Sequence, residues 1–263
     1  MARNLDIFKA IEEYAPLDLA EEWDHSGLAF GSYHAEARRI LLALDLVPGL
    51  VSEAAAKNIN LLIVHHPPLF NAINSLTDAT IEGEMQLNLI KNGISCYSAH
   101  TNLDRSPGGT AAAFAHKLQL DIEEEIYQIL MPLEDRPGFG YGLYATLANE
   151  QPFLEFSRLI ARRLEIPACQ RFSSENNQVK RFALFPGSFD ESCLARLEEL
   201  AADVLICGEI KHHIALMLEA RDIHVLAVGH DVSERDGMHL LAAYLRSKFP
   251  DLMIEVNKGI DYN

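Results

Sequence analysis

Four apolar segments of this chain are each followed at once by histidine or carboxylate side chains. The segments are LLIV at 61–64, ISCYS at 94–98, DVLICG at 203–208 and HVLAVG at 224–229. The polar residues that follow them are, in the same order, His65 and His66, His100 and Asp104, Glu209, and His230 and Glu234. Imidazole nitrogens and carboxylate oxygens bind divalent metals and transfer protons. One such segment is ordinary, whereas four in one chain predict a shared site.

The backbone around the first pair restricts how its histidines are placed. Neighbouring side chains of a strand point to opposite faces, so His65 and His66 can converge only if the chain turns there. Pro67 keeps His66 in extended backbone and cannot donate a strand hydrogen bond. The strand is therefore expected to end where the histidines begin.

The second half of the chain offers a pair at helical spacing. His230 and Glu234 are four residues apart, and they share one face if a helix begins near Asp231 or Ser233. This spacing is one by which helices bring metal ligands together.

Each of these residues also has a structural explanation when it is taken alone. A histidine at the end of a strand is commonly a cap or a core residue. A carboxylate at a helix start, such as Glu209 or Glu234, commonly interacts with the helix dipole. Asp104 could be a turn residue, and Trp23 could be a core anchor beside a surface turn. The joint pattern, and no single member of it, favours a metal site.

The elements that position these residues alternate between strand-like and helix-like patterns. Short continuous apolar runs separated by helices are typical of buried parallel strands, so the sequence predicts an α/β fold. Strands are expected at about 39–46, 61–64, 94–98, 141–147, 182–187, 203–208, 224–229 and 251–256. Helices are expected over 4–14, capped by Asn4, and over 48–58, about 79–92, 107–119, 152–164 and between 208 and 224. Open α/β sheets bind ligands at the carboxyl ends of their strands.

Residues 120–140 interrupt this alternation. They contain an acidic run, DIEEEI, and then a stretch rich in proline and glycine, EDRPGFGYG. Such a composition is typical of a boundary between lobes or of a surface loop.

Composition and charge disfavour several classes of function. Asp and Glu number 38 against 22 Lys and Arg, a formal net charge of −16. Proteins that depend on phosphate contacts to nucleic acid carry basic patches, whereas basic residues here form no cluster beyond short pairs such as Arg38-Arg39. No run of 18 apolar residues or secretory signal is visible, and the four cysteines form no CxxC pair. We therefore expect a cytoplasmic protein with free thiols that binds neither membrane nor nucleic acid.

Six segments, taken in order, resemble the motifs of the Nif three-like family, whose bacterial members are named as GTP cyclohydrolase type 2 homologues. They are EEWDHSGLAFG, ILLALDLVP, LLIVHHPPLF, YSAHTNLD, CGEIKHH and GHDVSE, and they extend from about 21 to 234. The length of the chain resembles the short form of the family, which lacks an inserted domain.

The resemblance implies a fold of two similar α/β lobes, with mixed, largely parallel sheets flanked by helices and a metal cleft between the lobes. Residues 1–125 and 205–263 would form the metal-bearing lobe and about 126–204 the second lobe, in one compact unit. It also implies a homo-hexamer. The implied ligands of two divalent ions are His65, His66, Asp104, His230 and Glu234. Glu209 and His100 would lie nearby as proton-transferring catalytic groups.

Two positions depart from the family pattern, and the metal is left open. His25 stands where the family usually has Asn, and Asp231 where an aromatic residue often follows GH. Both bear on substrate preference. Nitrogen and oxygen ligands without thiolate suit zinc, iron or manganese, and the sequence does not choose among them.

The function that the resemblance implies is a metal-dependent hydrolase that acts on a small anionic substrate, a purine nucleotide, with ring-opening hydrolysis of GTP as the named reaction. The alternative is a metal-handling or regulatory metal-binding protein without catalytic turnover. A scaffold linked to DNA or transcription ranks last, because the charge balance disfavours it.

Overall fold

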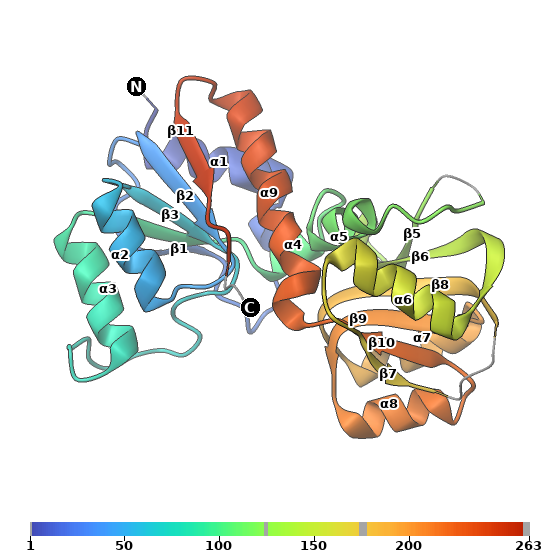
Figure 1. Ribbon diagram of the computed structural model, residues 1–263. Helices are drawn as coiled ribbons and strands as arrows, with labels where there is room; N and C mark the ends of the chain where they lie inside the picture. Colours follow the sequence, from blue (N-terminus) through green and yellow to red (C-terminus); the bar gives the residue numbers. More distant parts are fainter. Residues whose placement is uncertain (1, 124–125, 174–177, 260–263) are drawn as a thin grey trace. The chain divides into compact units, whose positions relative to one another are not determined.

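The computed structural model describes residues 2–123, 126–173 and 178–259 (Figure 1). The chain divides into two compact units, Met1–Ser106 with Met238–Asn263, and Pro107–Gly237. The lobes expected from the sequence divide the chain at 125/126 and 204/205 instead. Residues 107–118 join the second unit because Phe114 and Leu118 pack in the same core as Phe182 and Leu184.

The sheet of the first unit has the strand order β1 (Gly27–Phe30), β4 (Ser95–Ser98), β3 (Leu61–Val64), β2 (Arg39–Ala43) and β11 (Met253–Val256). β1 runs antiparallel to β4, and the other neighbours are parallel. In this register Ala43 pairs with Val64 and Val64 pairs with Ser98. The residues that follow these three strands therefore emerge at the same edge of the sheet.

Helices cover both faces of this sheet. They are α1 (Asn4–Tyr14), α2 (Pro48–Ala56), α3 (Ile81–Lys91) and the later turns of α9 (His230–Lys248), with a short 3-10 helix η1 (Leu17–Leu19) and a short α4 (Thr101–Asp104) in the connections. Alternate strand residues enter opposite cores: Leu61 and Ile63 pack with α1, and Leu62 and Val64 pack with α2. Burial on both faces explains why β3 is a continuous apolar run.

The sheet of the second unit has the strand order β5 (Gln128–Leu133), β6 (Arg136–Pro152), β8 (Gln178–Phe189), β9 (Val204–Ile210), β10 (His224–Ala227) and β7 (Gln170–Phe172). β8, β9 and β10 are parallel, and the remaining pairs are antiparallel. The helices of this unit are α5 (Thr110–Leu118), α6 (Phe153–Leu164), η2 (Glu191–Cys193), α7 (Leu194–Glu199), α8 (His212–Glu219) and the first turns of α9.

The predicted class, an α/β fold with mixed sheets flanked by helices, is confirmed. The expected strand at 61–64 coincides with β3, and the helix expected over 4–14 coincides with α1. Asn4 does not cap that helix, because its side chain is buried and donates to the Ser32 carbonyl and to Ser95 Oγ.

The stretch expected to be a boundary or a loop is instead a long antiparallel hairpin. β5 and β6 pair around Glu134 and Asp135, and the Pro/Gly-rich stretch forms the start of β6. Residues 124–125 of the acidic run lie outside the described residues. Within the part of the chain that is described, no helix is both long and apolar enough to cross a membrane.

Candidate metal-binding site

His65 and His66 occupy the turn that directly follows β3. The His65 backbone N–H donates to the carbonyls of Ala43 and Leu44, and the His66 N–H donates to that of Leu44. The ladder with β2 thus ends at the histidines, and both side chains come to the same end of the strand, with ring centroids 4.9 Å apart. This is the turn that their convergence requires.

His100 joins these two histidines from the end of β4. Its ring centroid lies 5.1 Å from that of His65 and 5.5 Å from that of His66. One ring nitrogen of each of the three residues lies within 4.8 Å of the others, so the three imidazoles form a group that could hold a metal ion. Because β3 and β4 end at the same edge of the sheet, His100 lies close to His66 and His65, although it follows them by 34 and 35 positions in the chain.

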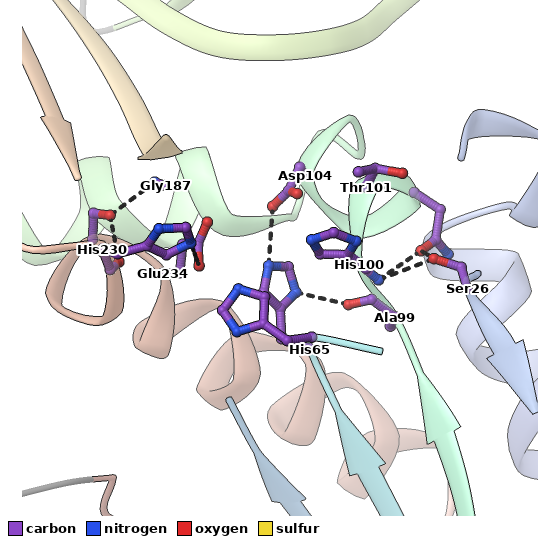
Figure 2. Close-up of polar contacts among 12 residues, drawn as sticks. Ser26, His65, Ala99, His100, Thr101, Asp104, Gly187, His230 and Glu234 are labelled. Atoms are coloured by element: carbon purple, nitrogen blue, oxygen red, sulfur yellow. Dashed lines mark hydrogen bonds and ion pairs between the residues drawn. The ribbon is translucent and has the colours of Figure 1, made fainter. Parts of the chain in front are cut away.

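Each of the three imidazoles has its Nδ1 held by an oxygen atom. His65 Nδ1 lies 2.8 Å from the Ala99 carbonyl oxygen, a contact drawn as a dashed line in Figure 2. His66 Nδ1 lies 2.7 Å from Asp45 Oδ1, and His100 Nδ1 lies 2.8 Å from Asp24 Oδ1. A carbonyl or carboxylate oxygen accepts, so Nδ1 carries the proton and the lone pair of the neutral ring lies on Nε2. Imidazoles that bind metals are oriented by this same type of contact.

Asp24 organises the surroundings of His100. Its buried carboxylate accepts from His100 Nδ1, from the His25 N–H, from the Thr101 N–H and hydroxyl, and from the Ser26 hydroxyl. Burial raises the pKa of Asp24, but hydrogen bonds from His100, Thr101 and Ser26 and the electrostatic interaction with His100 outweigh it and hold the pKa well below its usual range. The carboxylate is ionised at neutral pH and fixes the imidazole.

Asp104 lies beside His65 at the end of α4. The Asp104 Oδ1 to His65 Nε2 distance is 3.5 Å (Figure 2). Two ligand atoms on one ion, each about 2.1 Å from it, are roughly 3.0–3.5 Å apart in octahedral or tetrahedral geometry. The pair therefore fits joint binding of one ion. Because Asp24 also accepts from the Thr101 N–H at the start of α4, it helps to place Asp104 three residues later.

In the second unit, His230 lies between two carboxylates. α9 begins at His230 itself, and His230 Nε2 lies 3.1 Å from Glu234 Oε2, across one helical turn. His230 Nδ1 lies 3.3 Å from Glu209 Oε1, which follows the apolar part of β9. The Glu234 side chain is only 5% exposed, whereas that of Glu209 is 59% exposed. The separation of His230 and Glu234 also matches two ligands on one ion.

Two glycines allow the backbone of the sheet to approach the start of α9. Gly187 lies at an irregularity of β8 with a φ of +70°, and a Cβ there would lie 2.2 Å from Glu234 Oε1. Its N–H donates to Ser233 Oγ, whose hydroxyl donates to the His230 carbonyl. A Cβ at Gly208 of β9 would lie 2.5 Å from the Gly187 carbonyl oxygen. These contacts form a cradle around the carboxylate that only glycine permits.

The structure thus distributes the predicted site residues over two sets. The set in the first unit consists of His65, His66, His100 and Asp104. His100, predicted as a proton-transferring group, thus also belongs to the imidazole group. His230, Glu234 and Glu209 lie together in the second unit.

Sequence reasoning missed Asp24 and the glycine cradle. In the sequence, Asp24 stands within a turn motif, and the only signal of its role is a carboxylate beside the tryptophan of EEWDHSGL. Gly187 and Gly208 were visible as glycines that end apolar runs on neighbouring strands. His25 is exposed. Its backbone N–H donates to Asp24 Oδ1, and its carbonyl accepts from the Ser98 hydroxyl.

The fold and the donor sets define an α/β protein with histidine–carboxylate groups at the ends of parallel strands, a class suited to binding divalent metals. The chain belongs to the DUF34/NIF3 family (NGG1p interacting factor 3), whose model matches residues 2–260. It is similar to a protein of Clostridium perfringens named GTP cyclohydrolase 1 type 2 homolog, with 31% identity over 229 residues, covering 87% of this chain and 86% of that protein.

Solved structures share the fold of this chain. A Bacillus cereus protein described as related to NIF3 superposes with a TM-score of 0.90 at 18% identity, covering 100% of this chain and 98% of that one, which shows the shared fold. Reduced HcgD from Methanocaldococcus jannaschii superposes with a TM-score of 0.81 at 26% identity and covers 98% of each chain.

Proposed function

We propose that the protein is a metal-dependent hydrolase in which His65, His66, Asp104, His230 and Glu234 are the ligands of two divalent metal ions. The observation that carries the proposal is the convergence of His65 and His66 at the end of β3, each with Nδ1 oriented by an oxygen atom, so that Nε2 is the nitrogen suited to bind a metal. The donor set fits zinc, iron or manganese, which accept nitrogen and oxygen ligands.

The charge of the ligands favours an anionic substrate. Three neutral imidazoles and two carboxylates supply a charge of −2, and two divalent ions supply +4, which leaves an excess of about +2. An acidic chain of net charge −16 can therefore still bind a phosphate-bearing molecule at this one place. We take a purine nucleotide as the substrate class. The C. perfringens relative is named GTP cyclohydrolase 1 type 2 homolog, and we therefore take ring-opening hydrolysis of GTP as the specific reaction to test.

The chain's own residues would manage the protons of such a reaction. When bound, two divalent ions lower the pKa of a bound water from about 15.7 toward 7 and polarise the bond that is attacked. His100 can accept a proton at Nε2 while Asp24 stabilises the resulting imidazolium through Nδ1. Glu209 is exposed and can exchange a proton with solvent at its carboxylate.

Metal content tests the ligand assignment. We expect about two ions per chain in the parent protein by elemental analysis, and a loss of at least one in His66→Ala and in Glu234→Ala. His239→Ala is the matched control, because His239 is exposed on α9 and outside both ligand sets. Full metal content in either ligand variant would remove that residue from the proposal.

Turnover tests the hydrolase. Protein loaded with zinc, iron or manganese is incubated with GTP, and loss of the guanine absorbance is followed. No hydrolysis with any of the three metals, across a panel of nucleotides and phosphoesters, would overturn the enzyme assignment. Rapid metal exchange in the same protein would then identify a metal-handling protein instead.

A further inference from the structure

Two large aromatic side chains of the first unit are unusually exposed. Trp23, between η1 and β1, is 57% exposed, and Phe70, between β3 and α3, is 47% exposed. Trp23 is therefore not the core anchor that its sequence context allowed. The two rings come from distant segments, yet their centroids lie 6.4 Å apart and their planes differ by only 17°. Exposed aromatic groups that converge in this way commonly mark a binding surface.

The aromatic pair lies against the imidazole group. The His100 ring centroid is 6.0 Å from that of Trp23 and 5.7 Å from that of Phe70, with interplanar angles of 73° and 77°. His100 also contacts His65 and His66. His100 thus contacts both the aromatic pair and the two histidines of this unit that we assign as metal ligands.

We propose that Trp23 and Phe70 form a platform on which the planar heteroaromatic ring of the substrate stacks. Because the two ring planes are nearly parallel, a flat ring that stacks on either one is close to parallel with both. Stacking of bases on aromatic side chains needs no hydrogen-bond pattern, since every base has a π-face.

Charge orients such a substrate. Glu22 is exposed next to Trp23, and Asp24 on its other side has a carboxylate 2.8 Å from His100 Nδ1. These carboxylates disfavour a phosphate group at the aromatic pair and favour the uncharged ring there. The anionic end is then directed to the metal ligands. This inference rests on the proposed function, because it assumes that the substrate's anionic part lies at the metal ligands.

A single tryptophan makes the platform directly observable. Trp23 is the only tryptophan of the chain, so tryptophan emission reports on this site alone. Zinc-loaded protein is titrated with the monophosphates of guanosine, adenosine, cytidine and uridine. Ribose 5-phosphate and tripolyphosphate serve as anions without a ring. We expect saturable quenching of Trp23 by the nucleotides and none by the ringless anions.

Substitution of Phe70 separates stacking from anion binding. Phe70→Leu should weaken binding of guanosine monophosphate about 5-fold to 100-fold, the range for loss of one base-stacking side chain. Tripolyphosphate affinity, measured by calorimetry, should stay unchanged. Tyr33→Leu is the matched control, since Tyr33 is an aromatic residue 50% exposed in the same unit and in contact with Phe8 instead of His100.

The outcomes distinguish this inference from the proposed function. Unchanged Trp23 emission with all four nucleotides at millimolar concentration, or wild-type nucleotide affinity in Phe70→Leu, would overturn the platform. Quenching without hydrolysis would support the platform while the enzyme assignment fails. Hydrolysis with an unchanged kcat/KM in Phe70→Leu would support the enzyme while the platform fails.

Discussion

Replacement of Gly187 by alanine should damage metal binding far more than it damages the fold. Two costs follow from the structure. The φ of +70° is in the left-handed region, where a side chain costs about 1–2 kcal/mol. The new Cβ would also lie 2.2 Å from Glu234 Oε1, whereas ordinary contact begins at 3.4 Å. The carboxylate oxygen must therefore retreat by roughly 1.2 Å.

This displacement should lower the stability of the fold only slightly, but it should strongly lower the metal affinity of the site. The atom that moves is the far end of a flexible side chain, so a changed rotamer costs about 0.5–1.5 kcal/mol. Metal–ligand distances, in contrast, tolerate only about ±0.2 Å. Disturbance of the residues that orient a metal ligand typically lowers metal affinity about 10-fold to 100-fold, and we expect at least this loss.

Gly93→Ala provides the matched control. Gly93 has a φ of +68°, and nothing lies within 4 Å of the position that its Cβ would take. Both variants therefore share the backbone strain, and only Gly187→Ala displaces a carboxylate. For 150–250 residues, each kcal/mol lowers Tm by about 2–4 °C, so both should melt a few degrees below the parent.

The assay is competition between the protein and a chromophoric chelator for zinc, with Tm measured on the same samples. We expect Gly93→Ala to bind zinc like the parent and Gly187→Ala to bind it at least ten times more weakly. Should folded Gly187→Ala retain zinc affinity within about twofold of the parent, the assignment of Glu234 as a ligand would be refuted.

Other predictions follow from single contacts. Asp24→Asn removes the ionised acceptor of the Thr101 N–H, which helps to place the proposed ligand Asp104, and should lower zinc affinity about 10-fold, measured by the same competition. Burial raises the pKa of Cys96 to about 12 and that of Cys207 further, so neither thiol should react with Ellman's reagent at pH 8 until denaturant unfolds the chain. Burial lowers the pKa of His224 against the opposing charges of Asp203 and Asp222, so the folded state binds fewer protons than the unfolded state. Stability should then fall as pH drops below about 6.5, and the Tm difference between pH 7 and pH 5 should be smaller in His224→Phe.

The strands that position the site were predictable because burial on both faces leaves a plain record in the sequence. β3 is fully buried, and its four apolar residues gave its bounds directly. The β5–β6 hairpin, in contrast, was not predictable from its residue types. Its glycines read as a loop, but a Cβ at Gly140 would lie 2.1 Å from the Met131 carbonyl oxygen, so glycine is required there by close pairing of strands.

The residues of the candidate site were likewise predictable from the sequence only in part. Histidines and carboxylates that follow apolar runs can be recognised as candidate site residues from their residue type alone. The register of β3 and β4 does bring His65 and His100 together. Asp24 and Gly187 carry no such mark, because their roles arise from contacts across the fold. Asp24 meets His100 across 76 positions of the chain, and Gly187 meets Ser233 across 46.

Burial also explains why one carboxylate beside His230 is a better ligand candidate than the other. Glu234 is almost fully enclosed, and a buried carboxylate is costly unless positive charge compensates it. The divalent cation that we propose would add positive charge to that of any proton shared with His230, at the place where the glycine cradle holds Glu234. Glu209 contacts the same imidazole from a largely solvated position and needs no such compensation. Its hydration suits it to exchange protons with water, whereas the enclosure of Glu234 suits it to bind a metal ion.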